Sequence, residues 1–349
     1  MAVTSQQSSF LPLLKVGMPS GSEWFSRAAV VAGMGSVLLL LPLVLPSFQV
    51  SWISLGIIYV IVGLSINVLM GYAGQVSLGH QAFVGVGAFT SALMVSEVGM
   101  PFWFAIFVAA GTGAVAALAL GFVALRLKGL YLALITLAYG GIAERVIFSI
   151  PSLTGGGAGT LAPRPNGFAG ETAYLYVCYA VLGTVLFVDW RLLKTKAGRA
   201  ILAIRENEIA AASFGINVVG YKLLAFVLSG AVAGVAGSLF AHWRTVVVSV
   251  DFDFKLALTF VLMAAVGGLG SRAGIFGASM FFAIFPLAAN ALTVWVLIIG
   301  PVLLLFTLAV APGGMGQQLR PITEWLRGKP FSLKHDEGGV QTGGAGVRP

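Results

Sequence analysis

The feature of this sequence that most limits its fold is a long stretch without any charged residue. No Asp, Glu, Lys or Arg occurs between Arg27 and Glu97, and a second uncharged stretch separates Arg272 from Arg320. A membrane-spanning helix needs about 20 apolar residues, so each stretch is long enough for more than one span. Only 9% of the residues in the whole chain are charged, whereas soluble domains carry about 25%. These stretches do not fit a water-soluble core and predict a membrane protein.

The order of apolar runs, charges and Gly/Pro breaks predicts an all-α, polytopic bundle of about ten membrane-spanning helices. The transmembrane domain would cover residues 28–315, after a cytoplasmic segment (1–27). Residues 316–349 would form a cytoplasmic tail, which we expect to be disordered because its end is rich in glycine and polar residues. The predicted spans are residues 28–46, 52–70, 81–97, 102–125, 129–148, 172–189, 221–241, 256–270, 274–291 and 293–311.

Lysine and arginine in the short loops predict the orientation, because cytoplasmic loops are enriched in both. The segment 189–222 is rich in them and is therefore placed in the cytoplasm. Counting outward from it places both termini in the cytoplasm and segments 149–171 and 242–255 outside. Arg244 and Lys255 then lie outside, against the rule. The basic residues of the segment are Arg191, Lys194, Lys196, Arg199, Arg205 and Lys222.

Several function classes are disfavoured by composition. The basic residues behind the net charge of +8 lie in short segments beside apolar runs, so we expect no nucleic-acid partner. Cys178 is the single cysteine, so no intrachain disulfide can form. The three histidines lack the spacing of metal ligands, and we expect no metal or other cofactor and no catalytic residues. The chain also lacks a P-loop, GxxxxGK[ST].

The first candidate functional segment is residues 71–81, GYAGQVSLGHQ, which lies within the first uncharged stretch. Non-helical backbone inside a membrane is tolerated only where protein or water satisfies its polar groups. Gly-interrupted helices are also typical of translocation paths. The segment could therefore line or hinge a path, while a polar cytoplasmic turn fits the same residues. The candidate residues are Gly71, Gly74, Gln75, Ser77, Gly79 and His80.

The second candidate segment, residues 266–274, is another glycine-rich break after an apolar run. Two such breaks in corresponding places suggest an internal duplication with the path between the halves. Close helix packing through small residues, as in Gly230-xxx-Gly234, explains glycine equally well. The candidate residues for the path or hinge are Gly267, Gly268 and Gly270.

The third candidate segment is cytoplasmic, residues 198–221, within the loop 189–221. Glu208 at the start of a short Ala-rich helix and Gly215 after its end fit the rules of helix dipoles and helix ends. Such a helix could dock in a partner's groove, or it could lie on the membrane as an amphipathic anchor. The residues proposed for docking are Arg199, Arg205, Glu206, Asn207, Glu208, Ala210, Ala211 and Gly215.

Other classes of membrane protein compete with a docking subunit. An ion-coupled secondary transporter commonly carries acidic residues in mid-span, and Glu144 is the only acidic candidate here. For Glu144 and Arg145 we favour a structural role near the outer membrane interface over contact with a substrate. An intramembrane enzyme would need clustered polar groups at one depth, whereas His80 and His242 are predicted near opposite faces.

Six segments, in this order along the chain, resemble the permease subunits of bacterial branched-chain amino-acid (leucine, isoleucine, valine) ABC importers. The resemblance covers about residues 30–320. The third segment resembles the EAA loop of such permeases, with Glu208, Ala210, Ala211 and Gly215 in the places of that pattern. The six segments are GYAGQVSLGHQAFVGVGAF (71–89), GLYLALITLAYGGIAERV (129–146), TGGGAGT (154–160), the EAA-like loop, VGGLGS (266–271) and APGG (311–314).

The resemblance implies a translocation subunit, and not an enzyme, in the bacterial inner (cytoplasmic) membrane. Its implied partners are a second permease subunit, expected to be a different chain, two cytoplasmic ATP-binding subunits and a periplasmic binding protein. The EAA-like loop would be the coupling element to the ATPase. Related permeases for urea or short amides share these motifs and remain an alternative. Departures from the pattern at Gln81, Arg272 and residues 212–213 weaken the inference about the substrate more than that about the function.

Overall fold

The computed structural model describes residues 39–124, 127, 129–288 and 315–318, together with residues 33, 35, 36 and 302. Residues 42–320 form one compact unit, and the architecture below is that of this unit. Its eight longest elements are helices: α2 (Ser47–Ile66), α3 (His80–Ser96), α4 (Phe102–Ala124), α5 (Leu130–Arg145), α7 (Glu171–Lys194), α10 (Val218–Arg244), α11 (Phe254–Gly267) and α12 (Arg272–Ala288).

Shorter elements connect these helices. A π-helix, η1, directly extends α2, and 3-10 turns, short helices and two strands fill the loops. Their bounds are η1 (Asn67–Tyr72), η2 (Ile147–Ser149), α6 (Pro151–Thr154), η3 (Gly156–Ala158), β1 (Thr160–Leu161), α8 (Lys196–Glu206), α9 (Glu208–Ser213), β2 (Val246–Val247), η4 (Ser249–Phe252) and α14 (Met315–Gln318).

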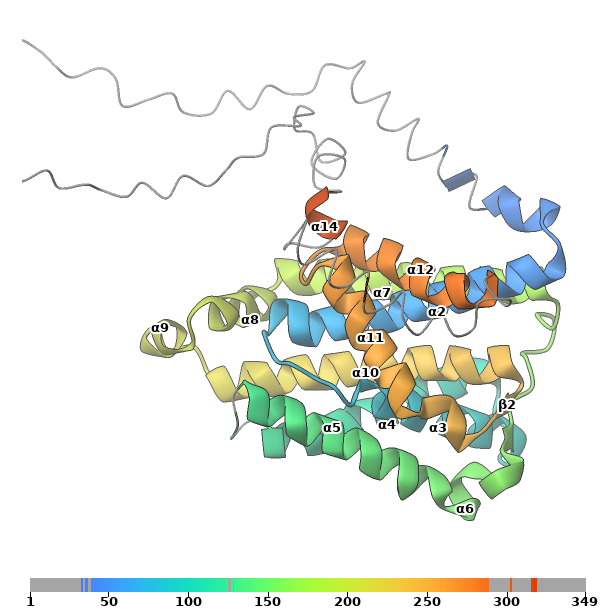
Figure 1. Cartoon of the computed structure of the whole chain (residues 1–349), viewed down its shortest axis with the longest axis horizontal. Coiled ribbons are helices and arrows are strands. Elements are labelled where there is room, and N and C mark those ends of the chain that lie inside the picture. Colours follow the sequence, from blue (N-terminus) through green and yellow to red (C-terminus); the bar gives the residue numbers. More distant parts are fainter. Residues whose placement is uncertain are drawn as a thin grey trace, which may run out of the picture. The chain divides into compact units, whose positions relative to one another are not determined.

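Helix α2 lies at the centre of the bundle. It is apolar on all sides, which is the pattern of a helix surrounded by protein, and most of its residues are buried. Helices α7, α10 and α12 pack around it. In Figure 1, α2, α7 and α10 run along the same general direction. Helix α2 therefore shares its buried surface with three other long helices.

Helix α10 packs unusually closely against α3 and α4 through glycine. A Cβ atom added to Gly234 would lie 2.2 Å from the carbonyl oxygen of Ala109 in α4, and one added to Gly237 would lie 1.9 Å from that of Val84 in α3. In a membrane the hydrophobic effect does not drive helices together, and small residues let the backbones approach closely. The small residues suggested by Gly230-xxx-Gly234 therefore serve as a packing surface.

The loops gather at two opposite ends of the bundle. At one end, β1 pairs antiparallel with β2, with Thr160 opposite Val247, so segments 149–171 and 242–255 lie side by side. Residues 73–76 and helices α8 and α9 lie at the other end, and Figure 1 shows α9 and β2 at opposite ends of the view. The two segments that the sequence placed on one side of a membrane therefore meet in space.

Eight of the ten predicted spans correspond to helices in the described part of the chain. Within that part, five helical stretches are long and apolar enough to cross a membrane: Ser47–Tyr72, Phe102–Val123, Leu130–Ser149, Glu171–Lys194 and Val218–Arg244. The three remaining helices, α3, α11 and α12, are shorter.

The predicted boundaries were partly wrong. Helix α2 begins at Ser47 and not at residue 52, and α11 ends at Gly267, before the rest of its glycine-rich turn. The predicted span 293–311, most of span 28–46 and most of the two terminal segments lie outside the described residues. An all-α membrane bundle is confirmed, and the count of ten stays a prediction.

The close packing of α10 predicts that alanine destabilises the protein at a glycine of α10 but not at a glycine of α7 that has open space around it. Gly237→Ala should destabilise the bundle, because overpacking typically costs about 1–3 kcal/mol. Gly183 of α7 has nothing within 4 Å of its Cβ position, so Gly183→Ala should be neutral or stabilising by up to about 1 kcal/mol. Thermal unfolding of the purified variants in detergent measures both effects. Equal melting temperatures for the two variants would contradict the packing role.

Candidate functional site

The three segments singled out from the sequence meet at the end of α2. The guanidinium of Arg205, in the last turn of α8, donates a hydrogen bond from Nη1 to the carbonyl oxygen of Gly71. Four residues earlier, Asn67 Oδ1 accepts a hydrogen bond of 2.7 Å from the backbone N–H of Gly270. Residues far apart in the chain thus form one cluster, which joins both glycine-rich breaks to the EAA-like loop.

The local backbone explains why glycine stands at this meeting point. The π-helix that ends α2 brings Gly71 against its neighbours, and a Cβ atom there would lie 2.0 Å from Asn67 Oδ1 and 2.8 Å from Gly270 N. Gly74 has a φ of +65°, which favours glycine and turns the chain out of the helix. π-Helical turns are frequent at functional sites.

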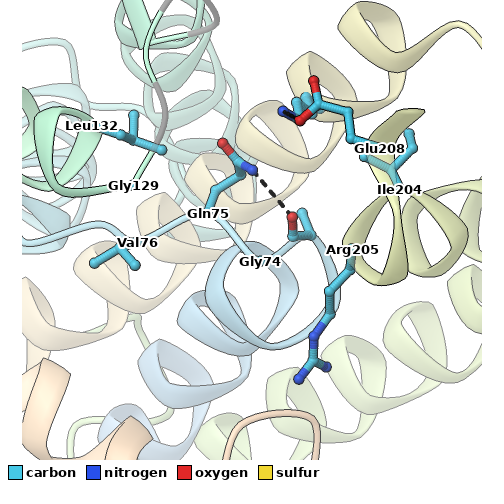
Figure 2. Close-up of a pocket in the computed structure, with 10 residues that line it drawn as sticks. Gly74, Gln75, Val76, Gly129, Leu132, Ile204, Arg205 and Glu208 are labelled. Atoms are coloured by element: carbon cyan, nitrogen blue, oxygen red, sulfur yellow. Dashed lines mark hydrogen bonds and ion pairs between the residues drawn. The ribbon is translucent and has the colours of Figure 1, made fainter. Parts of the chain in front are cut away.

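A pocket of about 230 Å³ opens beside this cluster (Figure 2). Two charged residues within it, Glu208 and Lys222, form an ion pair of 2.9 Å. Figure 2 shows the aliphatic part of Arg205 beside Gly74, with its guanidinium pointing away from Glu208. Polar and apolar residues therefore line the pocket together, and two of its three charged residues are paired with each other. Its lining residues are Ala73, Gly74, Gln75, Val76, Gly129, Leu132, Ile204, Arg205, Glu208 and Lys222.

The second half of segment 71–81 is buried inside the bundle. The backbone N–H of Leu78 donates to Thr136 Oγ1 of α5 over 2.9 Å, and a Cβ atom on Gly79 would lie 1.9 Å from the carbonyl oxygen of Thr136. Thr136 lies in the second turn of α5. The chain therefore runs inward from the end of the bundle before α3 begins at His80.

The polar side chains of this inward run are buried, and several are only partly hydrogen-bonded. His80 Nε2 lies 2.7 Å from Ser65 Oγ of α2, which itself donates to the carbonyl oxygen of Ser229 in α10. Ser77 Oγ, His80 Nδ1 and Gln81 Oε1 have no hydrogen-bond partner among the described residues. Of the candidate residues here, Gly74 and Gln75 face the pocket, whereas Ser77, Gly79 and His80 pack inside.

In the second break the glycines serve close packing and a turn. Gly267 packs against the start of α12, since a Cβ atom there would lie 2.8 Å from the Cα of Ile275. Gly268 and Gly270 have φ values of +88° and +91°, which favour glycine. The turn they make points the N–H of Gly270 at Asn67.

The EAA-like loop forms two short helices. Thr195 caps α8, and the side chain of Asn207 caps α9 by accepting from Ala210 N over 3.0 Å. Glu208 begins α9, and Gly215 follows its end with a φ of +77°. Arg199 and Glu206 are exposed, while Ala211 is buried.

Sequence reasoning missed an ion pair beside this cluster. Asp189 of α7, whose side chain is 4% exposed, pairs with Arg272 at the start of α12 and accepts a hydrogen bond from Tyr72 of η1 over 3.3 Å. Tyr72 directly follows Gly71, so the pair holds the same end of α2. The sequence did carry a signal for this pair: apart from Glu171 at its start, α7 has a single acidic residue, Asp189. An acidic residue within an apolar helix needs a cationic partner.

Comparison with known proteins identifies the family to which this arrangement belongs. The family described as "Branched-chain amino acid transport system / permease component" matches residues 48–308. The chain belongs to this family. The resemblance found in the sequence is therefore confirmed, and the chain is a multi-pass membrane protein of a transporter-permease family.

Individual relatives agree with the family. The chain is 34% identical over 259 residues to the high-affinity branched-chain amino acid transport system permease protein LivM of Escherichia coli, covering 66% of this chain and 61% of the relative. A probable LivM of Methanocaldococcus jannaschii is 27% identical over 62% of this chain and 74% of its own.

Shorter matches extend to two other permeases. A probable LivH of Methanocaldococcus jannaschii is 33% identical over a match that covers 36% of this chain and 42% of that relative. The autoinducer 2 import system permease protein LsrC of Enterobacter is 33% identical over a match that covers 29% of this chain and 31% of that relative. The chain spans about three fifths of the length of the Escherichia coli relative. No solved structure matches significantly.

The Asp189–Arg272 pair predicts a non-additive effect on stability. Asp189→Leu or Arg272→Met alone should each lower the unfolding free energy by about 3 kcal/mol, because a partly buried charge loses its partner. The double variant should recover most of this loss, since no unpaired charge remains. Thermal unfolding in detergent measures the cycle, and Arg191→Gln, an exposed neighbour on α7, serves as the control. Strictly additive losses would contradict the pairing.

Proposed function

We propose that this chain is the membrane-spanning permease subunit of an ATP-driven ABC importer for branched-chain amino acids, which a periplasmic binding protein delivers. The observation that carries this proposal is the family match over residues 48–308. It is supported by relatives named as branched-chain amino acid permeases over most of the same region. The chain itself is not proposed to hydrolyse ATP, because its sequence holds no P-loop.

We place the end of the bundle that carries α8 and α9 in the cytoplasm of a bacterial cell, with the protein in the inner membrane. The basic residues of the connection 189–217 support this orientation, because cytoplasmic loops are rich in lysine and arginine. The end with β1 and β2 then faces the periplasm. Ten spans, a cytoplasmic segment 1–27 and a cytoplasmic tail 316–349 complete the proposed topology.

The proposed complex contains a second permease subunit and two cytoplasmic ATP-binding subunits. A heterodimer of permeases is favoured by the similarity to both LivM and LivH proteins. The ATP-binding subunits would dock on α8 and α9. Ile209 and Phe214 are 79% and 85% exposed there. Large apolar side chains on a loop that projects from a membrane bundle fit a protein partner better than water.

Segments 71–81 and 267–270 would line or hinge the translocation path. Their supporting geometry is the interruption of α2, its inward continuation to Thr136 and the pocket beside Gly74. Irregular backbone at membrane depth occurs where it is buried in protein or lines a cavity. Glu144 and Arg145 lie at the end of α5 near η2, and we assign them a structural role.

Uptake by the reconstituted importer tests the proposed function. Proteoliposomes that contain both permeases and the ATP-binding subunits should accumulate labelled leucine when ATP and a binding protein are supplied. Accumulation of urea in place of leucine would keep the importer and replace the substrate. The absence of ATP-dependent uptake of leucine, isoleucine, valine, urea and short amides would contradict the proposal.

The docking role of α9 predicts a specific defect in Gly215→Asp. Gly215 has a positive φ and open space around it, as does Gly99 at the opposite end of the bundle. The two substitutions therefore impose similar local strain, but only Gly215→Asp adds a charge beside Phe214. We expect it to reduce co-purification of the ATP-binding subunits by about tenfold, the effect of losing roughly 1.4 kcal/mol of affinity.

Gly99→Asp is the matched control and should retain these subunits at the level of the unsubstituted chain. Equal retention of the subunits by both variants would argue against docking at α9. Equal amounts of the two permease variants in the membrane would show that insertion is unaffected.

A further inference from the structure

Two arginines of the EAA-like loop, both exposed, donate hydrogen bonds to backbone carbonyl groups of this chain. Arg199 bonds the carbonyl oxygen of Lys194, just before its own helix. Arg205 instead donates to the carbonyl oxygen of Gly71, at the end of α2. The two arginines lie on the same short helix, but only Arg205 connects that helix to the interrupted centre of the bundle.

We propose that Arg205 is a positioning residue that passes a displacement of α8 and α9 to both backbone breaks, the end of α2 and the turn between α11 and α12. This inference rests on the proposed function, in which ATP-binding subunits move α8 and α9. It assigns Arg205 to coupling within the permease and not to binding of the ATP-binding subunits.

The first contact that carries the proposal is with η1. The last carbonyl groups of a helix lack partners within the helix, and Gly71 is the penultimate residue of η1. A guanidinium is planar, always charged and rich in donors, so it suits a backbone oxygen. The Cβ position of Gly74 also lies 3.2 Å from Arg205 Cγ. Arg205 is thus held on two sides by the segment it would move.

The second contact is with the turn after α11. Arg205 Nη1 lies 3.5 Å from the Cβ position of Gly270, and that position lies 4.0 Å from the carbonyl oxygen of Gly71. Asn67 bonds the N–H of Gly270 over 2.7 Å. Arg205 and the end of η1 therefore lie next to this turn, and Asn67 ties the turn to η1 directly.

The contacts continue into two long helices. Asp189 of α7 pairs with Arg272 and accepts a hydrogen bond from Tyr72. Tyr72 directly follows Gly71, and Arg272 lies two residues after Gly270. Helix α7 leads into α8 through Thr195. A closed circuit therefore runs from α7 through α8, Arg205 and the two breaks back to α7. Chains of hydrogen bonds and salt bridges of this kind can carry energetic coupling between distant sites, and Arg205 is the link that α8 contributes through its side chain.

The experiment compares Arg205→Ala with Arg191→Ala in the reconstituted complex. Arg191 lies in the last turn of α7, at the same end of the bundle but outside α8 and α9, and it is exposed. For each variant, three quantities are measured: co-purification of the ATP-binding subunits, ATP hydrolysis with and without substrate-loaded binding protein, and substrate uptake. The melting temperature of each complex reports on folding.

We expect Arg205→Ala to assemble and hydrolyse ATP while uptake per ATP hydrolysed falls by about tenfold or more, the usual scale for losing a hydrogen bond from a charged donor. Stimulation of hydrolysis by the loaded binding protein should also be lost. Arg205→Lys should recover part of the lost uptake per ATP hydrolysed, because an ammonium group can still donate a hydrogen bond to one carbonyl oxygen. Arg191→Ala should match the unsubstituted chain in all three measurements.

A second variant tests the same path from the other side. Asn67→Ala removes the bond to Gly270 without touching α8, and it should also lower uptake per ATP. If both residues act in one path, the double variant with Arg205→Ala should be little worse than the more severe single variant.

Two results would overturn the inference. The first is an unchanged ratio of uptake to hydrolysis in Arg205→Ala, and the second is loss of the ATP-binding subunits from that variant, which would make Arg205 a docking residue. Absence of ATP-dependent uptake by the unsubstituted complex would instead overturn the proposed function and this inference with it.

Discussion

A backbone that leaves its helix inside a membrane must find partners for its amide and carbonyl groups within the protein, because hydrocarbon provides none. The break after α2 finds several such partners within the protein. Gln75 N bonds the carbonyl oxygen of Leu69, Leu78 N bonds the hydroxyl of Thr136, and the carbonyl oxygen of Gly71 accepts from Arg205. The surrounding helices are arranged so that these partners are present. The irregular segment thereby becomes the point at which α2, α5 and α8 meet.

The constraint also explains the two different uses of glycine. In α10, Gly230, Gly234 and Gly237 allow backbones to touch, which gives a tightly packed block of α3, α4 and α10. At the breaks, Gly74, Gly268 and Gly270 supply positive φ angles. Glycine therefore serves close helix packing in one part of the bundle and turn geometry in another.

The helix positions could be predicted from the sequence because apolar runs and isolated charges are local signals. The start and end of α9 were also predictable, since Asn207, Glu208 and Gly215 occupy positions where capping and dipole effects favour them. The end of α2 was not, because a π-helical extension leaves no mark in an apolar run. Its start was marked by Pro46, which directly precedes the helix, but the predicted span began at residue 52.

The convergence of the candidate site could not be predicted from local pattern. Arg205 and Gly71 are 134 residues apart, and Asn67 and Gly270 are 203 apart. Each contact joins a side chain to a backbone atom, so the residue type at the receiving position gives no hint of its partner. The partnership of Asp189 with Arg272 was equally hidden, although an isolated acidic residue near the end of an apolar helix requires a compensating charge.

The distribution of charge and neutral polarity bears on how such a bundle could change its conformation. Charged pairs lie at the two ends, Arg164–Glu171 and Arg244–Asp251 at one and Glu208–Lys222 and Asp189–Arg272 at the other. Between the ends, α2, α3 and α10 are joined by neutral contacts such as Ser65–His80 and Ser91–Ser238.

Neutral interhelical hydrogen bonds in membranes are worth only about 0.6 kcal/mol on average, so they can exchange at little cost. Ion pairs with a buried member cost more to break. Breaking the Asp189–Arg272 pair, whose carboxylate is 4% exposed, should therefore cost more than exchanging any one neutral contact between α2, α3 and α10. The end of α2 beside α8 is thus held by a stronger single interaction than those that join α2 to α3 and α10 further along the bundle.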